Sequence, residues 1–212
     1  MKLEGKKINF LGDSITEGYG CAGEENFFFN VLMREAGLAA ARNYGIGGTR
    51  IARQKGDEPA SSLAYCDRFD RMDDDADIIV VFGGTNDYGH GDAPIGRFED
   101  RAGDTYYGAC HMLMNGLIEK YPAATIVFMT PIHRSNEDNP SSGNGRPLSL
   151  YAAIIREVAA YYALPVLDLY SMSGIQPNNP VMRARYCPDG LHPNAAGHAL
   201  IASRLKGFLE TL

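Results

Sequence analysis

Short apolar runs alternate with segments of helical periodicity along the chain, and this alternation is the feature that most restricts the fold. Strand-like apolar runs occupy 7–12, 41–46, 77–84, 125–131 and 164–170. Helical spacing of apolar residues occupies 26–40, 60–74, 104–121, 148–163 and 194–211. Strands that alternate with helices form a parallel sheet covered on both faces. The pattern predicts a three-layer α/β fold, and because no linker or repeat divides residues 1–212, we expect one domain.

The connections that leave the strands differ from those that enter them. Those that follow the third and fourth runs are long and polar, as in YGHGDAPIGRFEDRAG and HRSNEDNPSSGNGRP. In a parallel α/β sheet, ligands bind beyond the carboxyl ends of the strands, and long loops in a compact domain are commonly functional. We therefore expect the functional site at this edge of the sheet.

Charge and composition argue against several classes of function. The net charge is −6 and no lysine- or arginine-rich run occurs, which disfavours binding to nucleic acid or to an anionic membrane. The four cysteines lack CxxC spacing, so no metal site is predicted. The N-terminal sequence has no signal peptide and the apolar runs are shorter than a membrane span, which favours a cytoplasmic location. Edge strands and exposed aromatic residues would permit a homo-oligomer.

The first strand-like run stops at the sequence GDSITEG, and its serine has two interpretations. Ser14 and Glu17 fit the S-x-x-E capping box, which satisfies backbone donors at the start of a helix. Alternatively, Ser14 is a nucleophile presented at the carboxyl end of a strand. One residue can do both, and we interpret Ser14 as a helix cap and a nucleophile.

Further polar motifs lie at the same predicted edge. They are NYGIGGTR after the second run, GGTNDYGHG after the third, and DGLHPNAAGH before the last helix. His192 can take the proton of a serine hydroxyl near neutral pH, and Asp189 can fix the tautomer of that histidine. An oxyanion formed during acyl transfer needs N–H donors. The backbone N–H of Ser14, an N–H of the glycine turn and the side-chain amide of Asn86 would supply them.

These motifs resemble the blocks of the SGNH hydrolases, also called GDSL-type hydrolases, which carry Ser, Gly, Asn and His in this order. The matching residues are Gly12-Asp13-Ser14, Asn43 to Gly48, Gly84-Thr85-Asn86-Asp87 and Asp189-Gly190-Leu191-His192. Ile15 stands where many members have leucine, and Gly47 beside Gly48 makes the assignment of the oxyanion glycine ambiguous. The resemblance implies a flavodoxin-like sheet of strand order 2-1-3-4-5, ester hydrolysis through an acyl-enzyme, and no metal or cofactor.

The resemblance also implies roles for individual residues. It assigns catalysis to Ser14, His192 and Asp189, and the oxyanion hole to Ser14, Gly48 and Asn86. Asp13 and Asp87 adjoin these residues, and we interpret both as carboxylates that orient the neighbouring backbone.

The loops at the site suggest a substrate class. Candidate substrate contacts are Tyr88, His90, His133 and Arg134, although ordinary surface histidines are the alternative for the two imidazoles. Hydrogen-bonding groups beside aromatic faces suit a small hydroxylated ester. We predict a small-molecule partner of this kind, with short-chain esters such as O-acetyl groups on carbohydrate as substrate.

Two alternatives remain at this stage. A lysophospholipase or acyl-thioesterase of the same fold would bind an acyl chain along Phe27, Phe28, Phe29 and Met33, although this segment could simply pack a helix on the sheet. A nucleotide- or flavin-binding module would hold a phosphate with Ser14 and Thr16 at a helix N-terminus. Against the second, no G-x-G-x-x-G motif directly follows a strand, and a phosphate site has no need of a histidine and an aspartate before the last helix.

Overall fold

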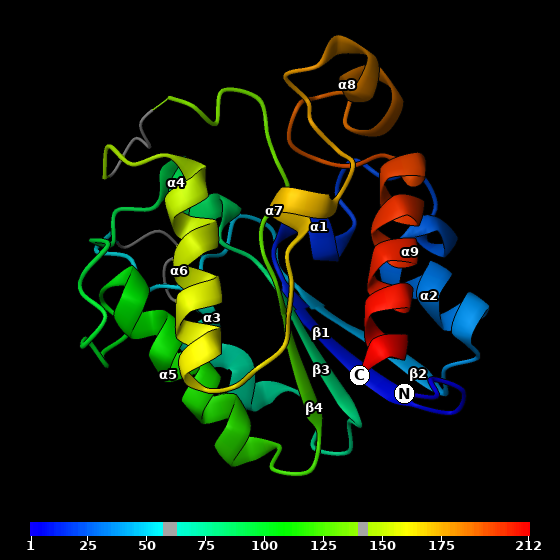
Figure 1. Cartoon of the computed structure of the whole chain (residues 1–212), viewed down its shortest axis with the longest axis horizontal. Coiled ribbons are helices and arrows are strands. Elements are labelled where there is room, and N and C mark those ends of the chain that lie inside the picture. Colours follow the sequence, from blue (N-terminus) through cyan, green and yellow to red (C-terminus); the bar gives the residue numbers. More distant parts are fainter. Residues whose placement is uncertain (57–62, 140–143) are drawn as a thin grey trace.

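The computed structural model describes residues 1–56, 63–139 and 144–212. Among these residues, the centre is a sheet of five parallel strands in the order β2-β1-β3-β4-β5, which confirms the implied topology (Figure 1). The strands are β1 (Lys7–Gly12), β2 (Ala40–Gly45), β3 (Ile78–Phe82), β4 (Thr125–Met129) and β5 (Val166–Leu167). Each neighbouring pair is parallel, so the carboxyl ends of the strands lie at one edge.

The central strands are buried on both faces. Successive side chains of β3 alternate, so that Ile78, Val80 and Phe82 join one core layer while Ile79 and Val81 join the other. All of these side chains are at most 2% exposed. A strand covered on both faces needs apolar residues at every position, which explains its continuous apolar sequence.

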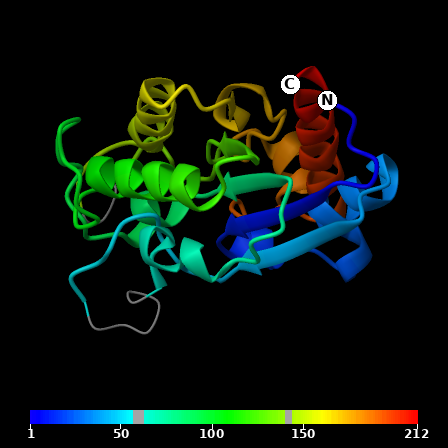
Figure 2. The same cartoon turned by 90° about the horizontal axis from the view of Figure 1, so that it is seen from below.

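The longer helices form the two outer layers (Figure 1). One face of the sheet packs against α2 (Phe28–Ala36) and α9 (Ala195–Thr211), and the other against α5 (Tyr106–Lys120) and α6 (Leu148–Tyr161). Phe10 of β1 contacts Phe28 edge to face, with ring centroids 5.5 Å apart. The two ends of the chain lie side by side (Figure 2), where the amino group of Met1 donates to the carbonyl oxygen of Glu210 at 2.9 Å.

Shorter helical elements occupy the connections. They are α1 (Ser14–Glu17), η1 (Glu24–Asn26), α3 (Tyr65–Arg68), η3 (Phe69–Arg71), α4 (Thr85–His90), α7 (Leu169–Met172) and α8 (Pro180–Tyr186). Because α1 and α4 closely follow β1 and β3, their first residues stand at the carboxyl edge of the sheet. In the part of the chain that the structure describes, no helix combines the length and apolarity needed to cross a bilayer.

The helix predicted over 60–74 is wrong in extent. Residues 60–62 lie outside the described residues, and the remainder forms only α3 and the 3-10 turn η3. Beyond η3 the chain is held by the buried hydroxyl of Tyr121, which donates to the carbonyl oxygens of Met72 and Asp73 at 3.1 Å each. A tertiary contact therefore overrides the helical periodicity of this segment.

The strand predicted over 164–170 is also shorter than expected, because β5 ends at Leu167. The carboxylate of Asp168 accepts hydrogen bonds from Thr130 Oγ1 at 2.8 Å and from Ser171 Oγ at 2.7 Å. These bonds turn the chain out of the sheet, and α7 begins at the next residue.

Candidate active site

Ser14 is the first residue of α1, and Asp13 caps this helix. Asp13 Oδ1 accepts a hydrogen bond from the N–H of Ile15 at 3.0 Å. The prediction that Ser14 caps the helix is therefore wrong, because the preceding carboxylate already holds that position. The chain turns tightly here, since a Cβ atom on Gly12 would lie 1.9 Å from Thr16 Oγ1.

Ser14, His192 and Asp189 form one hydrogen-bonded series across the end of β1. Ser14 Oγ lies 3.0 Å from His192 Nε2, and His192 Nδ1 lies 2.7 Å from Asp189 Oδ2. A carboxylate only accepts, so Nδ1 carries the proton of the neutral ring and Nε2 accepts from the Ser14 hydroxyl. The side chains predicted to act together are thus brought together, although 178 residues separate the serine from the histidine.

The carboxylate of Asp189 is fixed by the turn that carries His192. Its Oδ1 accepts the backbone N–H of Leu191 at 2.8 Å and that of His192 at 2.7 Å. Burial opposes ionisation of Asp189, but these N–H groups and the imidazole outweigh it and lower the pKa of the carboxyl. Asp189 is therefore ionised at neutral pH and can hold the ring in one tautomer.

Gly48 and Asn86 lie beside Ser14 and line the same pocket of about 360 Å³. Gly48 has a φ of +73°, which favours glycine, and of the described residues apart from its two chain neighbours none comes within 4 Å of where its Cβ would stand. Asn86 Nδ2 donates to the carbonyl oxygen of Thr49 at 3.0 Å. An amide nitrogen has two hydrogens, so the second remains for a group in the pocket.

Asp87 holds the loop that follows Gly48. Its two carboxylate oxygens accept the backbone N–H groups of Ile51 at 2.9 Å and Ala52 at 3.0 Å. Burial outweighs these hydrogen bonds and raises the pKa of Asp87 to about 6, and burial likewise raises the pKa of Asp13 to about 7. Through their hydrogen bonds both residues orient backbone: Asp87 holds the loop after Gly48, and Asp13 holds the start of α1.

Arg68 of α3 is a structural residue that the sequence analysis did not single out. Arg68 is 5% exposed, and its guanidinium donates to the carbonyl oxygens of Gly12 and Tyr44, at 2.7 Å each, and of Leu63 at 3.0 Å. It thereby joins the carboxyl ends of β1 and β2 beneath the site. An arginine flanked by ordinary helix residues gives no sequence signal for such a role.

The candidate substrate contacts divide into two groups. His90 and Arg134 line the pocket at Ser14. Tyr88 lies outside it, because its hydroxyl is turned away and donates to the carbonyl oxygens of Asn136 at 2.8 Å and Asn139 at 2.9 Å.

His133 also lies outside the pocket at Ser14. Its Nδ1 is 2.7 Å from Glu137 Oε1 and its ring contacts Tyr170. These contacts hold the imidazole in a separate cleft that includes Ser171 and Met182.

Some residues of the pocket were not predicted as site residues. They are Glu17, Tyr19 and Leu191, and the pocket also includes Gly47, the alternative to Gly48 as oxyanion glycine. The ring of Tyr19 stands 4.5 Å from that of His192, centroid to centroid. Glu17 lies three residues after Ser14, on the same turn of α1, which is the one sequence signal that could have indicated a pocket position.

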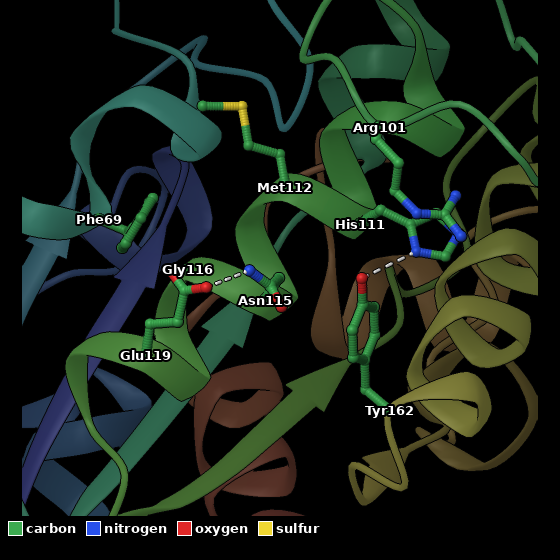
Figure 3. A pocket seen from close by; sticks show the side chains of 8 residues that line it. All are labelled: Phe69, Arg101, His111, Met112, Asn115, Gly116, Glu119 and Tyr162. Carbon is green, nitrogen blue, oxygen red and sulfur yellow. Dashed lines mark hydrogen bonds between the residues drawn. The ribbon is translucent and has the colours of Figure 1, made fainter.

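A larger pocket, of about 460 Å³, lies on the outer side of α5 (Figure 3). His111 and Tyr162 meet there through a hydrogen bond of 3.2 Å, and Arg101, Asn115 and Glu119 complete its polar lining. Of the described residues that line this pocket, none is a serine, threonine or cysteine. We therefore place the candidate active site at Ser14 despite the smaller volume there. Among the described residues, no three His, Cys, Asp or Glu side chains are grouped so as to hold a metal ion.

A doubly wound α/β sheet with serine, histidine and aspartate at its carboxyl edge defines a class of hydrolase-like proteins. Residues 10–200 match the GDSL-like lipase/acylhydrolase family, and the chain belongs to this family. The family comprises hydrolases that act on esters, and its model spans the residues of all the motifs described above.

Solved structures share the whole fold. A protein from Lactobacillus plantarum is 35% identical, with a TM-score of 0.86 over 98% of each chain. A protein assigned as a GDSL-like lipase from Bacteroides uniformis is 20% identical, with a TM-score of 0.74 over 98% of this chain and 97% of that chain. An acetyl xylan esterase is 21% identical, with a TM-score of 0.65 over 95% of this chain and 98% of that chain. No curated protein matches this chain in sequence.

Proposed function

We propose that this protein hydrolyses carboxylic esters through an acyl-enzyme on Ser14. His192 Nε2 takes the hydroxyl proton as Ser14 Oγ attacks the ester carbonyl, and then gives it to the departing alcohol. In the second half of the reaction His192 takes a proton from the water that attacks the acyl carbonyl, and returns it to Ser14 Oγ as the acid leaves. Asp189 keeps the imidazole oriented and stabilises its protonated form.

The oxyanion of each tetrahedral intermediate would be bound by donors already in place. Ser14, Gly48 and Asn86 all line the pocket beside the nucleophile, and we assign the oxyanion to the backbone N–H groups of Ser14 and Gly48 and to the second Nδ2 hydrogen of Asn86. Donors fixed before reaction stabilise developing charge without reorganisation, and one such donor typically contributes about 10²- to 10³-fold in kcat.

One observation carries the proposal. The Ser14 hydroxyl is 3.0 Å from an imidazole nitrogen whose other nitrogen is 2.7 Å from a carboxylate. Asp13 already caps α1, so the position of Ser14 is not explained by a capping role. A serine hydroxyl next to a correctly oriented base is what nucleophilic catalysis requires.

The pocket favours a short acyl group on a polar alcohol. Its lining includes the charged side chains of Glu17 and Arg134 as well as His90. Tyr19 is 63% exposed, so its ring offers a face on which a sugar ring could pack. We therefore propose acetyl esters of carbohydrates as the substrate class, with the small-molecule ester as the partner.

The acyl-chain alternative lacks a groove. Phe28 and Phe29 are 0% and 3% exposed and belong to the core between α2 and the sheet. Phe27 covers Gly18, whose Cβ position lies 2.2 Å from the Phe27 ring. These side chains support the fold, so among the described residues the phenylalanines of this segment are not free to line a trough for a long acyl chain.

The nucleotide-binding alternative is also disfavoured. An anion at the start of α1 would compete with the carboxylate of Asp13, which already binds the N–H of Ile15. In addition, the Ser14 hydroxyl is engaged by His192, and a phosphate would have to displace that contact.

The proposal is tested with wild type and Ser14→Ala. A fluorophosphonate probe should label the wild type, and p-nitrophenyl acetate should be hydrolysed, with both signals at background in the variant. Far-ultraviolet circular dichroism verifies that the variant is folded. Folded wild type that neither labels nor turns over would contradict the proposal. In a panel of acyl lengths, faster turnover of octanoyl than of acetyl esters would contradict the substrate class alone.

A further inference from the structure

His90 lies one helical turn after Asn86 on α4 and contacts its side chain. His90 Nε2 is 3.1 Å from Asn86 Oδ1, while Asn86 Nδ2 donates to the carbonyl oxygen of Thr49. An amide can adopt two orientations that exchange its oxygen and nitrogen, so its neighbours decide which group faces the pocket. The protonation of His90 Nε2 therefore matters for the oxyanion hole.

Arg50 determines which nitrogen of the neutral His90 ring carries the hydrogen. Its Nη2 is hydrogen-bonded to His90 Nδ1 and donates to the backbone carbonyl oxygen of His90 at 3.2 Å. A guanidinium has only donors, so Nδ1 must accept and the neutral ring carries its hydrogen on Nε2. Burial, and then the charges of Arg50 and Arg134, lower the pKa of His90, which keeps the ring neutral at pH 7.

We infer that His90 is a positioning residue that, held by Arg50, fixes the Asn86 amide with its nitrogen toward the nucleophile. The Nε2–H of His90 donates to Asn86 Oδ1, and Thr49 accepts one Nδ2 hydrogen from the other side. The remaining Nδ2 hydrogen is thereby reserved for the oxyanion. This inference rests on the proposed function, because it specifies how one donor of the proposed oxyanion hole is oriented.

The hydrogen bonds from Arg50 to His90 and from His90 to Asn86 form a relay. Through this relay His90 affects catalysis without contacting the reacting atoms. If the donor at Oδ1 is lost, the amide can rotate and present its oxygen, which repels a developing oxyanion. The transition state then loses more stabilisation than the bound substrate does, so kcat falls while KM changes little. The loss is bounded by the 10²- to 10³-fold effect of removing an oxyanion donor outright, and we expect about 10- to 100-fold.

Two variants of similar size separate this role from packing. Gln at position 90 can accept from Arg50 and donate to Asn86, whereas Met fills similar space and does neither. We expect His90→Met to lower kcat for p-nitrophenyl acetate about 10- to 100-fold with KM within about twofold, and His90→Gln to recover most of kcat. Equal losses in both variants, or wild-type kcat in His90→Met, would overturn the relay.

A readout on wild type remains if a variant fails to fold. Long-range proton–nitrogen NMR correlations at pH 7.5, assigned through the backbone resonances of the wild type, should show a neutral His90 ring with its hydrogen on Nε2. A hydrogen on Nδ1, or a protonated ring, would refute the inference. Wild type that shows the expected tautomer yet hydrolyses no ester would instead contradict the proposed function, so the two failures are distinguishable.

Discussion

Asp189 sets the tautomer of the His192 imidazole through its contact with Nδ1. Asp189 reaches Nδ1 from three residues away, and Gly190 between them has a φ of +84° and a Cβ position 2.2 Å from Ser135 Oγ. The turn is therefore restricted to glycine at this point, and it holds aspartate and histidine as one unit. A change at Asp189 should act on the chemistry of His192 more than on substrate binding.

Replacement of Asp189 by Asn tests this dependence. An asparagine amide can donate to Nδ1 and so stabilise the tautomer in which Nε2 carries the hydrogen and cannot accept from Ser14. We expect Asp189→Asn to lower kcat for p-nitrophenyl acetate by about 10³- to 10⁴-fold, with KM nearly unchanged. Steady-state kinetics with active-site titration would measure this.

The matched control is Asp77→Asn at the opposite edge of the sheet. Asp77 accepts hydrogen bonds from the Lys7 backbone N–H and the Lys6 ammonium, far from the pocket at Ser14. This variant should keep the wild-type kcat. If Asp189→Asn retained more than a tenth of the wild-type activity, the role given to Asp189 would be wrong.

Local motifs explain why much of the candidate site is readable from sequence. Asp189 and His192 share one turn, and Ser14 directly follows a strand, so short patterns contain their geometry. The position of the helix cap is different, because Asp13 and Ser14 are both good N-cap residues. In the structure Asp13 caps the helix, and the Ser14 hydroxyl is instead bound by His192 from a distant part of the chain.

At the scale of elements, the strand order follows from the alternation of strands and helices, but the ends of elements depend on distant partners. Asp168 ends β5 through Thr130, and Tyr121 holds the chain after η3. The pair of Arg50 and His90 is similarly nonlocal, since 40 residues separate them. No periodicity or short motif encodes such contacts, so they are found only in the folded chain.

Arg68 offers a prediction at this scale, because α3 is attached to the ends of β1 and β2 through its guanidinium. Arg68→Met would remove one donor each from the carbonyl oxygens of Tyr44 and Leu63, whereas that of Gly12 keeps the backbone N–H of Ile46 at 3.1 Å. An unsatisfied carbonyl group costs about 1–3 kcal/mol. Allowing for relaxation, we expect the free energy of unfolding to fall by roughly 3 kcal/mol. Urea denaturation followed by circular dichroism measures this.

The exposed Arg71 of η3, three residues along the chain, serves as the control. Arg71→Met removes the same charge and should change the free energy of unfolding by less than about 0.5 kcal/mol. A loss below about 1 kcal/mol in Arg68→Met would show that the guanidinium is not what joins the strand ends.

Across the whole molecule, buried titratable groups act in opposite directions on stability. Burial raises the pKa of Asp13 to about 7 and of Asp87 to about 6, so these carboxyls favour the folded state more as the pH falls toward 4. Burial lowers the pKa of His198 to about 4, so this group disfavours the folded state over the same range. The pH profile of wild type alone therefore does not isolate any one group.

The difference in unfolding free energy between wild type and His198→Asn does isolate His198, a residue of α9 that contacts the start of α2. Its Nδ1 accepts the N–H of Phe28 at 3.0 Å, and the Asn side chain of His198→Asn can place an oxygen near this point without titrating. Above pH 6.5 both folded and unfolded wild type hold a neutral histidine. As the pH falls to 4 the unfolded chain takes up a proton that the folded chain does not. The unfolding free energy of wild type should therefore fall, relative to His198→Asn, by roughly 3 kcal/mol between pH 7 and pH 4. Guanidinium denaturation of both proteins at several pH values measures the difference in unfolding free energy, and a constant difference would mean that His198 takes up its proton as readily in the folded protein as in the unfolded chain.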